Sequence, residues 1–393
     1  MRVAFYAPLK PPDHGVPSGD RRVARLLIQA LELAGHEVEV AARLRAWHGV
    51  PDAARQARIA RLGAALAERL LRRYRGRPAS ARPRAWLTYH LYYKAPDWIG
   101  PRVAEALGIP YLLAEASLAG KRANGPWAMG HAATRAALDR AAAVISLNPN
   151  DVEGLPDPGR VRPLAPFLDP APFQTAAAGR AAGRAAGRAA GRAAGRAAGR
   201  MTLAESHGLD SAQPWLLTVA MMRPGDKLAS YRLLAEALQH LRTSDWQLLV
   251  AGDGPARAEV EAALGAVPQD RVRLLGEVAS EALPALYAAC DLLVWPAIHE
   301  AYGMALLEAQ AAGLPVVAGQ GAGVAQLVLD GQTGRLTEAG DAAAFAQAVA
   351  GLLAAPETRR AMAAAAQARV AAEHGLTAAA ARLDAVLREA VAP

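Results

Sequence analysis

Two glutamates in the segment over 299–336, Glu300 and Glu308, have a spacing that suits the binding of phosphate and polyol groups. They follow an apolar run that ends at Pro296, and we expect a helix to begin near Gly303. The first N–H groups of a helix have no partner within it and carry partial positive charge, so they stabilise a phosphate group. A carboxylate in the same cleft can accept two hydrogen bonds from the diol of a ribose.

The spacing also bears on whether the two carboxylates can act together. Eight residues of helix turn by about 800°, which leaves Glu308 about 80° from Glu300 and two turns beyond it. Both carboxylates can then face one cleft, with Glu300 at the helix entrance near a sugar or an acceptor. The alternative is an amphipathic helix whose two glutamates are solvated.

The elements that must position these residues alternate between short apolar runs and helical patterns, which predicts parallel sheets covered by helices on both faces. A chain of 393 residues exceeds one hydrophobic core, so we expect two domains. The first-half strands are expected at 3–7, 36–40, 86–90, 109–116 and 143–148, and the second-half strands at 215–220, 246–252, 271–276, 291–296 and 314–319.

The domain boundaries follow from a change in composition. We expect an N-terminal domain over 1–165, a linker over 166–204, a second domain over 205–375 and a C-terminal helix over 376–393 that can return to the first domain. The linker holds an Ala-Ala-Gly-Arg repeat ending at Arg200, in which each glycine costs about 1 kcal/mol of helix stability relative to alanine. The repeat therefore predicts a flexible linker, and a tail that binds nucleic acid or membrane is the alternative.

Charge and cysteine usage narrow the expected partners and location. Six arginines of the repeat account for most of the net charge of +8, so the rest of the chain is only mildly basic and we expect no nucleic-acid partner. Cys290 is the single cysteine, which favours a reducing compartment, and we expect the cytoplasm. The chain has no apolar run of about 18 residues, so we expect neither export nor a membrane span.

Several ordered motifs give the segment around the two glutamates a more specific meaning. It runs Glu300, Ala301, Tyr302, Gly303 and Glu308, followed by GLPVV at 313–317, a glycine turn at 321–323 and DGQTGRL at 330–336. Upstream lie AGDGP at 251–255 and GEVASEALPALYAACDLLVWP at 276–296. In order and spacing this combination resembles glycosyltransferase family 4, and the resemblance covers essentially the whole chain.

The resemblance implies a GT-B fold of two facing Rossmann-like domains, with the donor bound by the second domain and transfer with retention of anomeric configuration. It implies that Glu308 holds the ribose, that Glu300 acts catalytically near the transferred sugar, and that no metal or cofactor is needed beyond a nucleotide sugar as co-substrate. The remaining donor-binding residues that it implies are Tyr302, Gly303, Met304, Gly252, Gly276 and Val278, the last two beside the nucleotide base.

The segment VAMMRPGDK over 219–227 resembles the cationic phosphate clamp of that family. Two cations there would offset charge that builds up on the leaving diphosphate. Lys227 fits the expected place, Met221 stands at the arginine position, and Arg223 is expected to substitute for it. Ordinary solvation of a loop is the alternative for both cations.

Residues of the first domain are expected to serve the acceptor and the catalytic centre. Gly19 matches the family's glycine loop, which approaches the donor phosphates and the catalytic centre, so the resemblance implies that Gly19 is a donor-binding residue. A plain strand-to-helix turn is the alternative, and Asp20 or Ser18 can cap the following helix. His90 ends the run at 86–90, which places it at the carboxyl edge of the sheet and suggests a catalytic role, although a lone histidine is usually structural.

The strand over 109–116 ends differently from that of many relatives. Ala116 stands where those relatives have a histidine, and Glu115 is expected to substitute for it. Lys121 and Arg122, farther along the chain, are the further acceptor contacts that we expect.

The helix expected over 53–73 is basic and amphipathic. It carries a stripe of Ile59, Leu62, Leu66 and Leu70. Its other faces hold arginines at 55, 58, 61, 69, 72 and 73. Such a surface is typical of peripheral contact with an anionic membrane, and packing of the stripe on the sheet is the alternative.

The reaction that this reading implies is transfer of a sugar from a nucleotide sugar to a hydroxyl of a glycan, a lipid-linked acceptor or a small molecule. A nucleotide-sugar epimerase of the same architecture and a nucleotide-sugar-binding protein of weakened activity are the alternatives.

Overall fold

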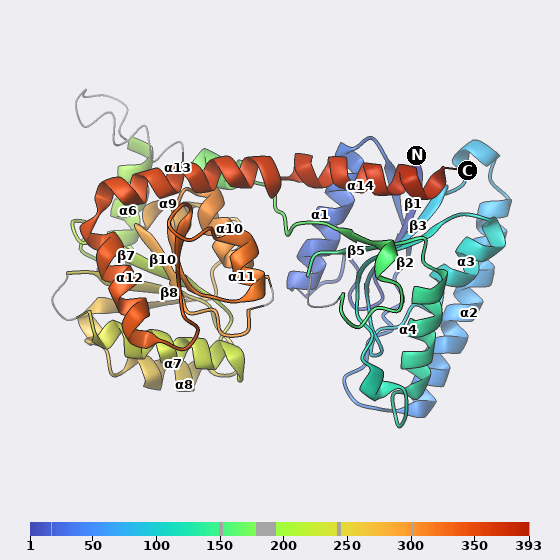
Figure 1. Ribbon diagram of the computed structural model, residues 1–393, viewed down its shortest axis with the longest axis horizontal. Helices are drawn as coiled ribbons and strands as arrows, with labels where there is room; N and C mark the ends of the chain where they lie inside the picture. Colours follow the sequence, from blue (N-terminus) through green and yellow to red (C-terminus); the bar gives the residue numbers. More distant parts are fainter. Residues whose placement is uncertain (17, 149–151, 178–193, 242–244, 301, 393) are drawn as a thin grey trace. The chain divides into compact units, whose positions relative to one another are not determined.

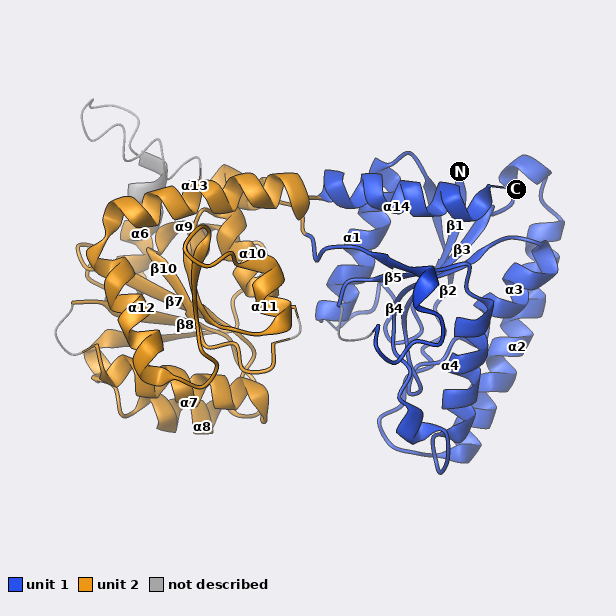
Figure 2. Ribbon diagram, in the orientation of Figure 1, with its two compact units in different colours: residues 1–167, 376–393 blue, residues 168–375 orange. Residues whose placement is uncertain are grey.

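The chain forms two compact units in the computed structural model, which describes residues 1–16, 18–148, 152–177, 194–241, 245–300 and 302–392. Unit 1 comprises Met1–Phe167 together with Leu376–Pro393, and unit 2 comprises Leu168–Gly375 (Figure 2). The C-terminal helix is therefore part of unit 1, although unit 2 precedes it in the sequence.

Unit 1 is built on a sheet of six parallel strands in the order β2-β1-β3-β4-β5-β6 (Figure 1). The strands are β1 (Arg2–Tyr6), β2 (Glu37–Ala42), β3 (Ala85–Leu91), β4 (Tyr111–Ala116), β5 (Ala143–Ser146) and β6 (Val161–Pro163). Its α-helices are α1 (Gly19–Leu33), α2 (Ala53–Arg75), α3 (Gly100–Leu107), α4 (Ala128–Arg140) and α14 (Leu376–Val391), and α14 packs against α1. Short 3-10 turns are η1 (Ala79–Ala81), η2 (Gly120–Arg122) and η4 (Pro158–Arg160).

Unit 2 repeats this arrangement with the strand order β12-β11-β10-β7-β8-β9. The strands are β7 (Trp215–Val219), β8 (Gln247–Ala251), β9 (Val272–Gly276), β10 (Leu292–Trp295), β11 (Val316–Gly319) and β12 (Gly334–Thr337). The helices are α6 (Ala194–His207), α7 (Asp226–Gln239), α8 (Arg257–Leu264), α9 (Leu283–Ala289), α10 (Met304–Ala311), α11 (Ala322–Leu327), α12 (Ala342–Ala354) and α13 (Pro356–Glu373), with the 3-10 turn η5 (Gln269–Arg271).

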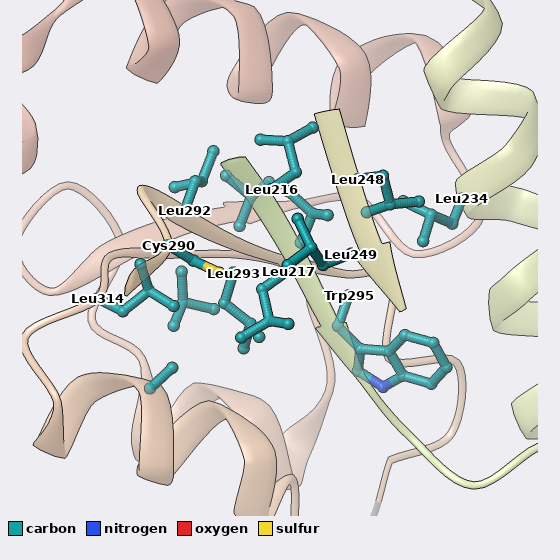
Figure 3. Packing of buried hydrophobic residues seen from close by; sticks show 14 of the residues in the cluster. Leu216, Leu217, Leu234, Leu248, Leu249, Cys290, Leu292, Leu293, Trp295 and Leu314 are labelled. Atoms are coloured by element: carbon teal, nitrogen blue, oxygen red, sulfur yellow. The ribbon is translucent and has the colours of Figure 1, made fainter. Parts of the chain in front are cut away.

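The central strands of unit 2 are buried on both faces, as their uninterrupted apolar runs predict. Leucines of β7, β8 and β10 interdigitate in the core, and the Trp295 indole lies at the end of β10 (Figure 3). The expected α/β fold of two Rossmann-like domains with parallel sheets is confirmed. The short strands β6 and β12 are the two that apolar runs do not reveal, because neither is a fully buried run.

Each sheet reverses its strand order at one point, between β1 and β3 in unit 1 and between β7 and β10 in unit 2. The helices that follow the two central strands diverge there to opposite faces, which opens a crevice outside the carboxyl ends of the strands. Open α/β sheets bind their ligands at such positions, so the loops after these four strands are where site residues are expected.

We expected a linker over 166–204, but the described residues at both ends of this range belong to the compact units. Residues 178–193 lie outside the described residues, whereas 168–177 and 194–204 belong to unit 2. The end of the repeat forms the start of α6, where the Arg200 guanidinium lies 3.9 Å from the centre of the Trp215 ring and donates to the carbonyl oxygens of Gln213 and Ala289. Helix propensity takes no account of these tertiary contacts, which hold α6 in place.

We expect replacement of Arg200 with alanine to lower the free energy of unfolding by about 2 kcal/mol or more. The side chain is 14% exposed and also pairs with the Asp291 carboxylate at 3.0 Å, so its loss removes a half-buried cation and several hydrogen bonds together. Urea denaturation measures the change. Arg232→Ala, at an exposed position of α7, is the control and should stay within about 0.5 kcal/mol of wild type. Equal midpoints for the two variants would refute the anchoring role of Arg200.

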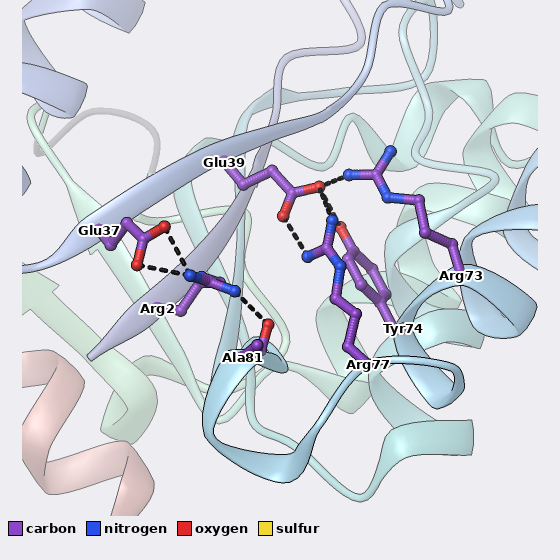
Figure 4. Close-up of polar contacts among 7 residues, drawn as sticks. All are labelled: Arg2, Glu37, Glu39, Arg73, Tyr74, Arg77 and Ala81. Carbon is purple, nitrogen blue, oxygen red and sulfur yellow. Dashed lines mark hydrogen bonds and ion pairs between the residues drawn. The ribbon is translucent and has the colours of Figure 1, made fainter.

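The basic helix α2 is held in unit 1 by packing and by ion pairs. Of its expected stripe, Ile59 and Leu70 are buried and Leu66 packs against the core, while Leu62 is exposed. Figure 4 shows its carboxyl end fixed to β2, because Arg73 and Arg77 both pair with Glu39. In the same figure Arg2 of β1 pairs with Glu37. Most of the stripe thus has a structural role, and contact with an anionic membrane stays a prediction.

Within the part of the chain that the structure describes, none of the helices combines the length and the apolar character that crossing a membrane requires.

Candidate functional site

The strand-order reversal of unit 2 brings together two of the residues expected to be catalytic. Lys227 lies in the first turn of α7, after β7, and Glu300 lies in the loop after β10. The Lys227 ammonium forms an ion pair with Oε2 of Glu300, and the Trp295 indole N–H donates to the same oxygen at 3.2 Å. The ammonium also lies 5.3 Å from the centre of the Trp295 ring. The Lys227 side chain is 32% exposed and the Glu300 side chain is 15% exposed. A cation and a carboxylate thus lie together at the sheet edge.

The loop that carries Glu300 is tied to α7 at two further points. The Ser230 hydroxyl accepts a hydrogen bond from the Ile298 amide at 3.0 Å, and His299 Nδ1 lies 2.9 Å from Oδ1 of Asp226. Ala297 and His299 have positive φ angles of 55° and 48°, which non-glycine residues seldom adopt. Backbone of this kind persists where surrounding contacts enforce it and often occurs in ligand-binding loops.

Helix α10 begins immediately beyond this loop, and its N-terminus has no side-chain cap. Gly303 has φ 62°, and a Cβ atom there would lie 2.8 Å from Cδ1 of Leu306, so the turn requires glycine. Its carbonyl accepts from the amides of Leu306 and Leu307. The amides of Met304 and Ala305 lie in the first turn, where no carbonyl of the helix can accept from them. The first turn therefore presents N–H groups suited to an anion. Tyr302 is half-buried beside them.

The expected start of a helix near Gly303 is confirmed, because Gly303 turns the chain in a left-handed conformation and α10 begins at Met304. The helical geometry by which Glu300 was related to Glu308 is wrong, since Glu300 lies in the preceding loop. Glu308 lies within α10 and is 3% exposed. Its Oε2 accepts a hydrogen bond from the Tyr287 hydroxyl of α9 at 2.9 Å, a partner that the sequence did not suggest. Glu300 therefore lies on a loop and Glu308 on a helix.

The remaining donor-side candidates lie in loops at the same edge of the sheet. Arg223 is exposed, and no hydrogen bond or ion pair joins its guanidinium to another described residue, while Met221 is also exposed. At Gly252 a Cβ atom would lie 1.9 Å from the Ala220 carbonyl oxygen, so close backbone packing explains this glycine. The Gly252 amide donates to the Gly276 carbonyl at 2.8 Å, and Val278 packs against the core of unit 2.

The reversal point of unit 1 holds His90 and Asp20. His90 is the last residue but one of β3 and has φ 62°, and its Nδ1 lies 3.1 Å from Oδ1 of Asp20 in α1. Burial raises the pKa of the Asp20 carboxyl, but the hydrogen bond and charge of His90 outweigh that effect and hold the pKa below its ordinary value. Ser18 is the cap of α1, since its hydroxyl accepts from the Arg21 amide at 3.2 Å. A Cβ atom on the exposed Gly19 would meet open space.

Glu115, expected to contact an acceptor, has a structural role. It is buried at the end of β4, and its Oε1 accepts a hydrogen bond from the Leu147 amide at 2.5 Å, which joins the ends of β4 and β5. Its backbone has φ 57°, a left-handed conformation that a strand pattern in the sequence does not predict, and its side chain is buried. Lys121 is exposed in η2, and the Arg122 guanidinium lies 5.5 Å from the centre of the Tyr93 ring.

Sequence reasoning missed the partners that hold the site residues. Trp295, Tyr287 and Asp226 contact Glu300, Glu308 and His299 respectively. Only Trp295 carries a signal in the sequence, because a tryptophan at the end of a buried strand lies at the ligand-binding edge. No group of three or more residues suited to hold a metal ion occurs among the residues described, and the absence of a metal requirement stays a prediction.

Comparison with known proteins places this geometry in a family context. Residues 213–355 match the family model described as glycosyl transferases group 1. The match lies wholly within unit 2 and includes Lys227, Glu300 and Glu308. The glycosyl transferase group 1 pattern therefore coincides with the unit whose reversal point brings the cation and the carboxylate together.

The chain is also similar to individual proteins over longer stretches. It is 36% identical over 188 residues to alpha-D-kanosaminyltransferase from Streptomyces kanamyceticus, which is 48% of this chain and 48% of that protein. The chain thus spans about half the length of this curated relative.

Two solved structures resemble nearly the whole chain. A glycosyltransferase from Rickettsia africae has a TM-score of 0.72 at 16% identity, covering 99% of this chain and 98% of that one. Anabaena Alr3699/HepE in complex with UDP-glucose has a TM-score of 0.66 at 17% identity, covering 99% and 100%. These likenesses establish the fold, which is the two-domain Rossmann-like fold of GT-B glycosyltransferases.

Proposed function

We propose that the protein is a glycosyltransferase that moves a sugar from a nucleotide-sugar donor to an acceptor hydroxyl, with retention of anomeric configuration as in family 4. The observation that carries the proposal is the pairing of Lys227 with Glu300 in front of the uncapped N-terminus of α10, within the segment that matches the glycosyl transferase model. A cation and free helix amides at one position suit a diphosphate, and a carboxylate beside them suits the attached sugar.

In this proposal the diphosphate of the donor lies at the first turn of α10, where the amides of Met304 and Ala305 donate to it. The Lys227 ammonium interacts with the diphosphate as well as with Glu300. It stabilises the negative charge that grows on the diphosphate as the glycosidic bond breaks. Arg223, whose guanidinium is exposed, supplies the second cation. Glu300 then lies near the transferred sugar.

Glu308 binds the ribose of the nucleotide in the same proposal. The Tyr287 hydroxyl holds one oxygen of its carboxylate, and a carboxylate suits the two hydroxyls of a ribose diol. The backbone near Gly276 and Val278 contacts the base. In unit 1, the pair of His90 and Asp20 orients an imidazole at the reversal point, and we assign it to the acceptor side of the reaction.

Similarity supports the class of donor, since the Anabaena protein is described in complex with UDP-glucose and the Streptomyces relative is named for transfer of a kanosaminyl group. We propose a nucleotide sugar as the only co-substrate. Met221 in place of the expected arginine favours the alternative of a weakened, binding-only protein, and the experiment below separates the two.

A panel of UDP-, GDP-, ADP- and dTDP-sugars tests the proposal by thermal unfolding and by release of the nucleoside diphosphate. Ligands that bind only the folded state stabilise it by about 2.7 kcal/mol at a hundred times their dissociation constant, so one donor should raise the midpoint by several degrees. The same donor should release its diphosphate slowly in water. Stabilisation without any release would support the binding-only alternative, and no stabilisation by any donor would contradict the proposal.

A further inference from the structure

A cluster of aromatic and cationic side chains lies at the carboxyl edge of the unit 1 sheet. Its residues come from the loops that follow β2, β3 and β4, which are far apart in the sequence. We call it the aromatic cluster, and its members are Arg45, Trp47, His48, Tyr92, Tyr93, Lys94, Arg122 and Trp127. Glycosyl transfer at unit 2 does not account for it.

The aromatic rings form one continuous series that begins at the reversal point of the sheet. The ring centres of His90 and Tyr92 are 5.5 Å apart, those of Tyr92 and Tyr93 are 5.6 Å apart, and those of Tyr93 and Trp127 are 5.3 Å apart. The Trp47 indole N–H joins the series by donating to the Tyr92 hydroxyl at 3.0 Å. Trp127 is buried, while Trp47, Tyr92 and Tyr93 are half-buried and present part of their surface to a ligand.

Three cations lie against these rings. The Lys94 ammonium is 5.8 Å from the centre of Tyr93 and 5.7 Å from that of Trp127. Arg122 lies 5.5 Å from the Tyr93 ring and Arg45 lies 4.6 Å from the Trp47 ring.

None of the three cations pairs with a carboxylate of any described residue, whereas Arg2, Arg73 and Arg77 of the same unit all do. Cations gathered at a ligand-binding edge without counter-ions attract an anionic group.

Two buried side chains beside the cluster each carry a polar atom without a hydrogen-bond partner among the described residues. His48 is 2% exposed and its ring lies tilted against that of Trp127, with ring centres 4.8 Å apart. Its Nε2 has no hydrogen-bond partner within the described ranges. Gln56 is 1% exposed, its amide nitrogen donates to the Pro126 carbonyl at 2.8 Å, and its Oε1 likewise has no partner there. Buried polar atoms of this kind are rare in folded proteins because leaving them unpaired is costly.

We infer that the aromatic cluster is the acceptor subsite and that it takes a sugar or similar polyhydroxylated ring bearing a phosphate or carboxylate group. This assignment of the substrate class rests on the proposed glycosyl transfer. The half-buried rings cover the face of the acceptor ring, and Lys94 and Arg122 bind its anionic group. A ring bearing an ammonium group is disfavoured, because it would approach three cations that lack counter-ions.

Isothermal titration with three hexoses that carry an anionic group, no charged group and a cationic group tests the inference. The probes are glucose 6-phosphate, glucose and glucosamine, each titrated into the full chain. We expect glucose 6-phosphate to bind at least about tenfold more tightly than glucose, and glucosamine to bind most weakly. The double variant Lys94→Met, Arg122→Met should lose at least about tenfold in affinity for glucose 6-phosphate. The single variant Lys94→Met provides the same comparison if the double variant unfolds.

Arg84→Met is the matched control, because Arg84 is exposed just before the opposite end of β3 and loses the same charge. It should bind glucose 6-phosphate as wild type does. Equal affinity for the charged and neutral rings, or equal effects of the Lys94 and Arg84 variants, would overturn the inference. Titration of the nucleoside diphosphate identified by the donor panel into the same variants reports on unit 2 separately. A failed acceptor assignment with normal binding of that diphosphate therefore leaves the proposed function standing.

Discussion

Replacement of Lys227 with alanine should lower kcat for sugar transfer about 100-fold or more while the KM for the donor changes much less. Removing a single preorganised donor from a site of developing charge typically has this effect, because the interaction strengthens as the leaving group becomes negative. The ammonium of Lys227 is held at that position by Glu300 and by the Trp295 ring, so few other groups can take its place. Steady-state kinetics with the donor identified by the panel measure both constants.

Two control variants make this result specific to the charge. Lys227→Arg keeps a cation at the site and should retain more activity than Lys227→Ala. Arg232→Ala removes a cation from an exposed position of the same helix, and its kcat should equal that of wild type. A Lys227→Ala enzyme with normal kcat would show that this side chain does not stabilise the leaving group.

Replacement of Glu308 with glutamine should weaken binding of the nucleoside diphosphate by about 10- to 100-fold, since a hydrogen bond to a charged group contributes about 1.5–3 kcal/mol. Glutamine keeps the volume of this buried side chain and can still accept from Tyr287, so the fold should persist. Calorimetric titration of the diphosphate measures the change directly. Affinity equal to wild type would contradict the ribose role.

Tyr287→Phe is the matched control for Glu308. It removes the hydroxyl that holds the carboxylate but leaves the charge in place. We expect it to weaken diphosphate binding by less than the Glu308 variant does, because the carboxylate stays available and loses only its orientation. If the Tyr287 variant had the larger effect, the hydroxyl itself would be the group that contacts the nucleotide.

The fold was largely predictable, because buried parallel strands leave uninterrupted apolar runs that can be recognised one at a time. The runs at 86–90 and 291–296 became β3 and β10 almost residue for residue. The same reasoning did not predict α6, because tertiary contacts stabilise this helix. The glycines of the repeat weaken a helix locally, but the contacts of Arg200 with Trp215 and Asp291 are made only in the folded unit.

The candidate site was predictable in part for a similar reason. Lys227 and Glu300 are far apart in the sequence. The order of the motifs predicts that both serve the donor. Their ion pair could not be predicted in this way, because it depends on the order of the strands in the folded sheet. The start of α10 depends on the left-handed conformation of Gly303, and Glu115 has a left-handed backbone that a strand pattern does not predict. The aromatic cluster joins three loops, so no local pattern could reveal it.

The central claim is that unit 2 binds the diphosphate of a nucleotide sugar between Lys227 and the first turn of α10. A crystal structure of the protein with the donor identified by the panel tests it most directly. We expect the diphosphate within hydrogen-bonding distance of the Lys227 ammonium and of the Met304 and Ala305 amides, with the ribose at Glu308. A nucleotide bound away from α10, or in unit 1, would contradict the account.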